Sequence, residues 1–281
     1  MREDGPVLAG GSIYYDKNVL NILLIGTDER AKHFSDNARA DSMLLMSLHM
    51  KNKTVKLASL ERAIGVPVPG REDDWLTHVF RYGGADLLLK TVRDCFKLDV
   101  TRYVRVNFGT FEKIVDSIGG VDITLTQLEA KALNNEVYTN AIANTRVKTG
   151  LNHLSGYNVL QYSRLRFIDS DWRRVERQRT TIQAMIDQTK SLSLPELNEL
   201  LDVALPLVRT NFTQGELSGL VLKAPRFLGA KTAQKTIPEK GTYWGYKNPS
   251  GRSLFGIDFE KNSAALREFF YGKDALSSTK N

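Results

Sequence analysis

Cysteine is almost absent from this sequence of 281 residues, because Cys95 is its only one. A single cysteine excludes an intramolecular disulfide, a cysteine-based zinc site and a haem-attachment motif. Long apolar runs are missing near the N-terminus, where residues 1–12 are mostly small or polar. That stretch has neither the apolar region of a signal peptide nor the roughly 20 apolar residues of a membrane span. We therefore expect the chain, as it stands, to be soluble.

Several common catalytic motifs are missing as well. The sequence has no P-loop, no dinucleotide-binding glycine pattern and no Gly-x-Ser-x-Gly elbow, so we do not expect nucleotide-cofactor chemistry. Its four histidines, His33, His49, His78 and His153, do not have the spacing of metal ligands. We expect each of them to be structural or exposed.

The composition is that of an ordinary globular protein with excess positive charge. Apolar residues make up 42% and charged residues 25% of the chain, and the net charge is +7. Together with a pI near 9.3, this charge favours an anionic partner, which can be a nucleic acid, a membrane surface or a phosphorylated substrate. Charge alone does not choose among the three.

Strand and helix patterns alternate in the first half of the chain. Apolar or alternating runs predict strands at 21–26, 42–50, 54–60, 103–107 and 121–125, with a hairpin turn at 51–53. Helical spacing predicts helices at 84–96 and 108–118, the second closed by Gly119 and Gly120. This order of elements predicts a layered α/β sheet.

The second half begins with an irregular, polar excursion at 126–149. Helices are expected at 155–162, 171–192, 194–208, 214–222 and 260–271, and a last strand at 253–257. No repeat and no convincing domain boundary is visible. We expect a tail over residues 1–20 and one catalytic domain over residues 21–281.

Two aspartates lie where strands begin or end. Asp28 follows the first predicted strand and Asp41 precedes the second, positions at which active-site groups collect in α/β folds. Arg39 and Arg62 flank the same strands, so four charged side chains can converge at one edge of the sheet. Two carboxylates there can hold a cation such as Mg²⁺. The alternative, a turn aspartate and a strand-cap aspartate, stays open.

The stretch 164–179 contains six arginines and no lysine. An extended segment would place Arg164 and Arg166 on one side, and a helix would place Arg174, Arg177 and Gln178 on one face. Guanidinium groups bind phosphate oxygens in pairs, so the choice of arginine favours an anion site. A solvated basic helix, balanced by neighbouring acidic residues, is the alternative.

Seven segments, in order, resemble the LytR-CpsA-Psr family of cell-envelope phosphotransferases. They read NILLIGTDER at 21–30, RADSMLLMSL at 39–48, SLER at 59–62, THVFRYGGADLLLKTV at 77–92, YVRVNFGTFEKIVDSIGGVDI at 103–123, LNHLSGYNVLQYSRLR at 151–166 and DWRRVERQ at 171–178. Any one segment is only suggestive, whereas seven in family order are highly specific.

The resemblance implies a three-layer α/β sandwich, in which a central mixed sheet is flanked by helices. It implies an enzyme that takes a glycan phosphate from a polyprenyl pyrophosphate carrier and transfers it to a cell-wall acceptor, usually peptidoglycan, with Mg²⁺ or Mn²⁺. The metal would be held by Asp28 and Asp41, and catalysis would use Asp41, Arg39 and Arg62. The residues implied in binding the pyrophosphate are Arg62, Arg164, Arg166, Arg174, Arg177 and Gln178.

The chain departs from the family pattern at two positions. Many relatives have an aspartate where this chain has Ala63, and a common asparagine is replaced by Thr77. Any role of the missing carboxylate is then absent or supplied by Glu61. Relatives also usually carry an N-terminal membrane anchor, so we expect a trimmed extracytoplasmic domain that is membrane-associated in the full-length protein.

Two other functions remain compatible with the sequence. The same site can hydrolyse the polyprenyl pyrophosphate if water replaces the acceptor. A non-enzymatic protein that binds an anionic polymer or nucleic acid would also explain the high pI, although no nucleic-acid-binding module is recognisable.

Overall fold

The structure of the protein is a computed structural model, and it describes residues 5–29, 34, 38–135, 146–166, 168–190, 192–227 and 230–272. The chain forms two compact units. The first unit consists of Met1–Glu29, His33–Arg105 and Arg209–Asn281, and the second of Arg30–Lys32 and Val106–Val208.

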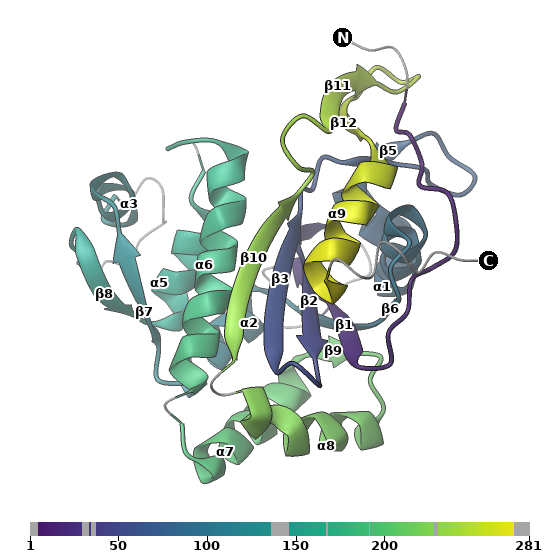
Figure 1. Ribbon diagram of the computed structural model, residues 1–281. Coiled ribbons are helices and arrows are strands. Elements are labelled where there is room, and N and C mark those ends of the chain that lie inside the picture. Colours follow the sequence, from purple (N-terminus) through teal and green to yellow (C-terminus); the bar gives the residue numbers. More distant parts are fainter. Residues whose placement is uncertain are drawn as a thin grey trace. The chain divides into compact units, whose positions relative to one another are not determined.

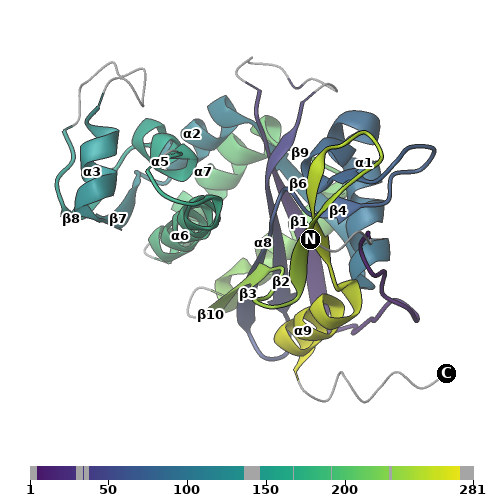
Figure 2. The same ribbon diagram turned by 90° about the horizontal axis from the view of Figure 1, so that it is seen from above.

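A six-stranded mixed sheet forms the centre of the first unit (Figures 1 and 2), and its strand order is β10-β3-β2-β1-β6-β9. The strands are β1 Val19–Thr27, β2 Ala40–His49, β3 Thr54–Leu60, β6 Val100–Val106, β9 Arg209–Thr210 and β10 Lys231–Ile237. The pairs β1–β2, β2–β3 and β6–β9 are antiparallel, whereas β10 pairs with β3 in parallel. The sheet is therefore mixed, as expected.

Two helices cover one face of this sheet, α1 Leu76–Phe96 and α9 Phe259–Tyr271 (Figure 2). They share a buried core with the strands, including Leu23, Leu45 and Leu88. Helix α1 bends at Gly83 and Gly84, and Gly84 has a φ of 64°, which favours glycine. The predicted helix at 84–96 is the part of α1 after this bend.

Smaller elements complete the first unit. They are β4 Gly65–Val66, β5 Asp74–Trp75, α8 Gln214–Lys223, the 3-10 helix η2 Ala224–Phe227, β11 Tyr243–Lys247 and β12 Ser253–Ile257. β4 pairs with β5 and β11 pairs with β12. Strands β10 and β11 were not expected from the sequence.

The N-terminal segment is attached to the first unit by backbone hydrogen bonds. The Val7 amide donates to the carbonyl of Ile257 at 3.2 Å, and the Tyr14 amide donates to the carbonyl of Lys97 at 3.0 Å. Residues that we expected to form a tail are therefore part of the fold.

The second unit has its own core and a two-stranded sheet. Its elements are α2 Phe108–Ser117, β7 Val121–Leu125, α3 Gln127–Leu133, β8 Gly150–Leu154, α5 Gly156–Arg164, α6 Asp171–Thr189, α7 Leu194–Ala204 and the 3-10 helix η1 Leu205–Leu207. Strand β7 pairs with β8 and not with the central sheet. The expectation that 121–125 belongs to the main sheet is therefore wrong, because polar β8 supplies its partner.

The α/β class with a central mixed sheet flanked by helices is confirmed. The predicted excursion at 126–149 contains α3, and its residues 136–145 lie outside the described part of the chain. Among the described residues, no helix has both the length and the apolarity that a membrane crossing requires. A single catalytic domain over 21–281 stays a prediction.

Candidate active site

The end of β1 brings Asp28 against Arg39. The register of the pairing between β1 and β2 shifts between Gly26 and Thr27, just before Asp28. Such an irregularity changes the direction of the strand. The Arg39 backbone amide donates to Asp28 Oδ1 at 2.9 Å, and Arg39 Nε donates to Oδ2 at 3.0 Å. The hydrogen bond to Asp28 raises the pKa of Arg39. Asp28 therefore orients Arg39 through both of its oxygens.

Asp41 lies beside Arg62 at the same end of the sheet. We expected Asp41 just before a strand that starts at residue 42, but it is the second residue of β2. Its Oδ1 is 3.7 Å from Nη1 of Arg62, too far for a hydrogen bond. That oxygen is buried and has no hydrogen-bond partner among the described residues. A buried carboxylate oxygen in this state is suited to binding a cation.

Thr77 joins the two segments that carry Asp41 and Arg62. Its hydroxyl donates to the carbonyl of Ala40 at 2.8 Å, and its backbone amide donates to the carbonyl of Arg62 at 3.1 Å. The side chain is buried, with 1% exposed. The residue that replaces the usual family asparagine is therefore a positioning residue, which sequence reasoning treated only as a departure.

Glu61 is buried, with only 1% of the residue exposed, whereas the side chain of Asp41 is 32% exposed. That Glu61 supplies the carboxylate missing at Ala63 stays a prediction.

A buried ion pair that the sequence did not reveal lies next to Asp28. Glu29 Oε1 accepts from Nη2 of Arg105 at 2.6 Å, and Glu29 Oε2 accepts from the hydroxyl of Thr27 at 2.5 Å. The guanidinium of Arg105 lies over the rings of Phe34 and Phe80, 4.7 and 4.6 Å from their centroids. Glu29 stands beside Asp28 in the sequence, but nothing local predicts a partner 76 residues away.

The second unit holds the arginine-rich stretch. Arg164 is the last residue of α5, and its guanidinium lies 4.2 Å from the ring centroid of Phe108. The expected extended segment is therefore wrong at Arg164, which is helical. Arg166 follows α5 and is exposed. Arg164 is thus the last residue of α5, and Arg166 lies two residues after it and is exposed to solvent.

Arg174 and Arg177 on α6 are buried, with 5% and 3% of each residue exposed. Arg174 donates to Asp171 at 3.1 Å. Arg177 donates to both oxygens of Asp169, at 2.7 and 2.8 Å, and to the carbonyl of Leu165 at 3.0 Å. The geometry favours a supporting role for Arg177, because it joins α6 to the segment after α5.

The remaining residues of α6 differ in exposure. Gln178 is half-buried, one position beyond Arg177. Arg173 is exposed and donates to Glu176 at 2.7 Å, as a solvated surface charge would. Arg179 is half-buried, and burial lowers the pKa of its guanidinium. The arginines of α6 are therefore partly buried and do not form a purely solvated surface.

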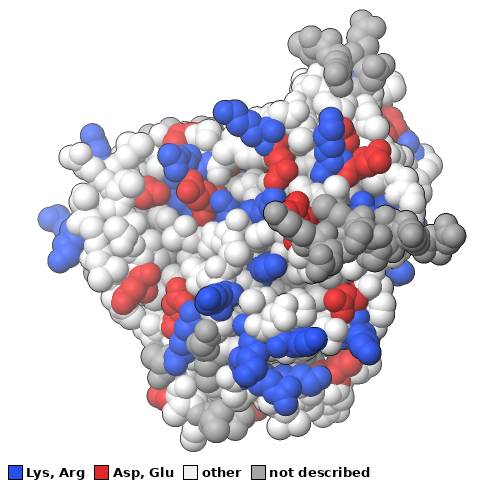
Figure 3. Space-filling view, viewed as in Figure 1, with Lys and Arg blue, Asp and Glu red and all other residues white. Residues whose placement is uncertain are grey.

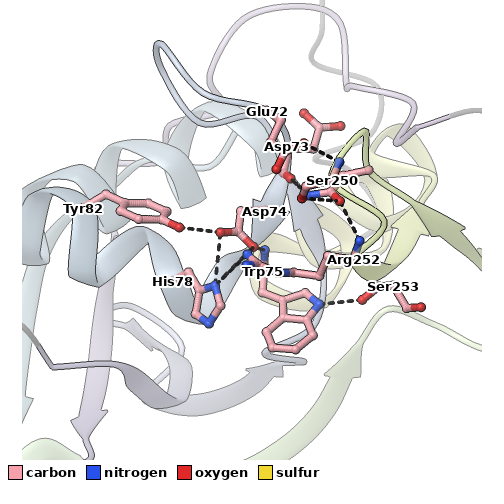
Figure 4. A network of polar contacts seen from close by, with 10 residues as sticks. Glu72, Asp73, Asp74, Trp75, His78, Tyr82, Ser250, Arg252 and Ser253 are labelled. Carbon is pink, nitrogen blue, oxygen red and sulfur yellow. Dashed lines mark hydrogen bonds and ion pairs between the residues drawn. The ribbon is translucent and has the colours of Figure 1, made fainter.

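A polar network surrounds the buried carboxylate of Asp74 in the first unit (Figure 4). Asp74 accepts from the backbone amide of Trp75 at 2.7 Å, from the hydroxyl of Tyr82 at 2.5 Å and from the guanidinium of Arg252. Nδ1 of His78 is 3.1 Å from it. Burial alone would raise the pKa of Asp74, but the hydrogen bonds from Arg252, Tyr82, Trp75 and His78 lower it to about 2.

The other histidines have local partners. His49 is buried near Asn52, and His153 lies 2.7 Å from Asp122, whose hydrogen bond raises the pKa of the imidazole. His33 lies outside the described residues. In the described part of the chain, no group of three histidine, cysteine or acidic residues is arranged to hold a metal. A Mg²⁺ ion held by one or two carboxylates and substrate phosphates is not of that kind.

Positively charged side chains also gather away from Asp41 and Arg62. Figure 3 shows lysine and arginine side chains gathered over the turn between β2 and β3 and over α8. Lys51 and Lys53 in that turn are exposed, as is Lys223 at the end of α8. This turn is at the end of β2 and β3 opposite Asp41 and Arg62.

Comparisons with known proteins found similar sequences and structures. The sequence profile described as the LytR_cpsA_psr family matches residues 8–265. The chain is 32% identical over 256 residues to the polyisoprenyl-teichoic acid–peptidoglycan teichoic acid transferase TagT of Bacillus subtilis, covering 90% of this chain and 76% of TagT. It is 31% identical to TagU of Oceanobacillus iheyensis, named for the same activity, covering 82% of this chain and 69% of TagU.

Solved structures show the same fold. The structure of TagT bound to LI-WTA has a TM-score of 0.73 at 28% identity, covering 94% of this chain and 98% of that one. A structure described as the LytR-CPS2A-psr family protein YwtF (TagT) with bound octaprenyl pyrophosphate lipid has a TM-score of 0.69 at 26% identity, with coverage of 94% and 98%.

The Glu29–Arg105 pair is expected to be important for stability. Glu29→Gln leaves a charged guanidinium buried without its anion, so we expect the free energy of unfolding to fall by about 3–5 kcal/mol. Asp94→Asn, which breaks the exposed pair with Lys90 on α1, should change it by less than about 1 kcal/mol. Denaturant unfolding measures both, and equal losses would contradict the assignment.

The Asp74 network makes stability depend on pH in the acid range. Because the folded protein lowers the pKa of Asp74 from 3.8 to about 2, the carboxylate stabilises the fold above the higher value and loses this effect as pH falls. We expect the unfolding free energy of the native chain to exceed that of Asp74→Asn at neutral pH. The difference should shrink from about pH 4 to about pH 2. A difference that stays constant over that range, in denaturant titrations, would exclude this role.

Proposed function

Because the chain belongs to the LytR-CpsA-Psr family, we propose that it transfers a glycopolymer phosphate from a polyprenyl pyrophosphate carrier to a cell-wall acceptor such as peptidoglycan. The observation that carries this proposal is the match over residues 8–265 together with 90% coverage at 32% identity to a teichoic acid transferase. The chain is accordingly a transferase of the glycopolymer–peptidoglycan ligase type.

The donor is a lipid-linked pyrophosphate. A structure similar to this chain contains octaprenyl pyrophosphate, and another contains LI-WTA. We propose a role in pyrophosphate binding for each of the residues that the family resemblance implies: Arg62, Arg164, Arg166, Arg174 and Gln178. Arg177 supports them by holding α6 to the segment after α5. Arginine suits this task, because its planar guanidinium binds two phosphate oxygens at once.

The carboxylate of Asp41 fits a divalent cation. Its buried Oδ1 has no hydrogen-bond partner among the described residues, and an oxygen of this kind is a ligand that Mg²⁺ or Mn²⁺ accepts. Both oxygens of Asp28 accept from Arg39, so Asp41 is the first candidate ligand and Asp28 the second. Such a cation, when bound, would neutralise negative charge on the phosphates during transfer.

The transfer itself breaks one phosphorus–oxygen bond and forms another. A hydroxyl oxygen of the acceptor attacks the phosphorus that carries the glycan, and the bond from this phosphorus to the bridging oxygen breaks. Polyprenyl phosphate leaves with that oxygen. We assign Asp41 as the base that takes the hydroxyl proton, while Arg62, 3.7 Å away, keeps positive charge near it. Positioning and charge stabilisation are the main requirements of phosphoryl transfer.

The location of the activity follows from its substrates. A cell-wall acceptor places the reaction outside the cytoplasm, and the lipid carrier brings the enzyme to the membrane surface. We propose that the full-length protein is held there by an anchor, as the family resemblance implies.

The pyrophosphate assignment is tested by lipid retention. Protein purified from bacterial cells should carry polyprenyl phosphates that mass spectrometry detects, and Arg164→Ala combined with Arg166→Ala should abolish this binding. Arg173→Ala is the matched control, because Arg173 is 65% exposed and paired with Glu176. Unchanged lipid in the double variant would overturn the assignment.

The role of Asp41 is tested by transfer from a lipid-linked glycan to peptidoglycan. We expect Asp41→Asn to lower the rate by about 10²-fold or more, with bound lipid retained. Chelation should inhibit the native enzyme, and Mg²⁺ or Mn²⁺ should restore it. Release of polyprenyl phosphate that is indifferent to acceptor would indicate a hydrolase instead. Binding that needs no metal and falls steeply with salt, without turnover, would indicate an anionic-polymer-binding protein.

A further inference from the structure

Aromatic and arginine side chains, some exposed and some half-buried, gather around Asp74 in the first unit. We call Arg71, Trp75, His78, Tyr82 and Arg252 the aromatic–arginine cluster. The rings of Trp75 and His78 are 5.0 Å apart, and those of His78 and Tyr82 are 6.5 Å apart, edge to face. The guanidinium of Arg71 lies 4.4 Å from the ring centroid of Tyr82, and that of Arg252 lies 5.5 Å from that of Trp75.

The cluster is held in place by hydrogen bonds to Asp74 and Ser253, and part of its surface is exposed. Asp74, with 6% of its side chain exposed, binds Tyr82 and Arg252 and lies within 3.1 Å of His78, while the indole N–H of Trp75 donates to the carbonyl of Ser253 at 2.7 Å. In contrast, Tyr82 is 36% exposed, the side chain of Arg252 is 37% exposed, and Arg71 is exposed. The rings are therefore held in place while part of their surface remains available.

This cluster adjoins the segment that carries the proposed catalytic residues. Thr77, which bonds to the carbonyls of Ala40 and Arg62, lies between Trp75 and His78 in the first turn of α1. All of these residues belong to the first unit. A ligand on the cluster would lie next to the chain segments that present Asp41 and Arg62.

The chemistry of the cluster suits an anionic saccharide. Aromatic rings pack against the apolar faces of sugar rings, which are the main hydrophobic surface of a sugar. Arginines beside them bind carboxylates in pairs and lose less hydration than lysines would. Asp74 explains why Arg252 is held there, but it does not explain why Arg71 and the ring of Tyr82 are left at the surface.

We propose that the aromatic–arginine cluster is the subsite for the acceptor glycan, a saccharide that carries carboxylate groups. This inference rests on the proposed transfer to a cell-wall acceptor. The donor brings pyrophosphate, and the arginines assigned above are proposed to bind it. The acceptor brings sugar rings and carboxylates, and the cluster offers a matching group for each.

Acceptor kinetics test the subsite. We expect Tyr82→Ala to raise the KM for soluble peptidoglycan fragments about tenfold, equivalent to ~1.4 kcal/mol, while the KM for the lipid-linked donor stays unchanged. Tyr82→Phe keeps the ring and should restore acceptor binding to within about twofold. Tyr243→Ala is the matched control, because Tyr243 is also 36% exposed but pairs with Ile257, at the end of the β11–β12 pair away from Arg252 and Ser253, and lies edge to face with Phe255.

Binding measured without turnover separates this proposal from the transferase function. Polymer-free peptidoglycan should sediment the native protein, and Tyr82→Ala and Arg71→Ala should each weaken this binding about tenfold. If the native protein binds in this way but transfers nothing, the subsite stands and the transferase function fails. If it transfers while both variants keep native binding and acceptor KM, the subsite is excluded. A rise in donor KM alone would also overturn the acceptor assignment. Melting curves confirm that each variant is folded.

Discussion

The antiparallel pairing of β1 with β2 is the constraint on which the candidate site depends. It sets Thr27 opposite Ala40, so Asp28 and Asp41 emerge at the same end of the sheet. Carboxylates so placed repel each other unless cations lie near them. Arg39 and Arg62 supply that charge from the adjoining segments, and one oxygen of Asp41 has no hydrogen-bond partner among the described residues. This oxygen is the feature on which the proposed cation site rests.

Patterns that depend on neighbours in the sequence were predictable. The strands at 54–60 and 121–125 have the bounds that alternation predicted, and the aspartates at the ends of strands were found from their positions. Strands β8 and β10 were missed because their sequences are largely polar and gain strand structure only from a partner. Strand β11 was missed because Gly245 interrupts its aromatic residues. Only the second part of helix α1 was predicted, because Gly83 and Gly84 interrupt the helical spacing of its apolar residues.

The arginine-rich stretch shows where sequence reasoning stops in the site. Helical spacing places Arg174 and Arg177 on one face, but it cannot tell a side chain that waits for a ligand from one that is already paired. That distinction depends on Asp169 and Glu129, and Glu129 comes from α3, 48 residues earlier. In the same way, the sequence did not indicate that Arg105 pairs with Glu29. Long-range ion pairs follow from the fold and not from spacing.

Burial divides the charged groups by task. Buried ion pairs, such as Glu29 with Arg105, cost much to separate and hold the chain in place. Partly exposed charged groups next to strand ends, such as Asp41 and Arg62, are those to which we assign ligand binding. Thr77 links the two tasks, because one buried residue bonds to both strand-end segments and begins the helix that carries His78 and Tyr82. A substitution at Thr77 would therefore affect both the proposed acceptor subsite and the proposed catalytic carboxylate of Asp41.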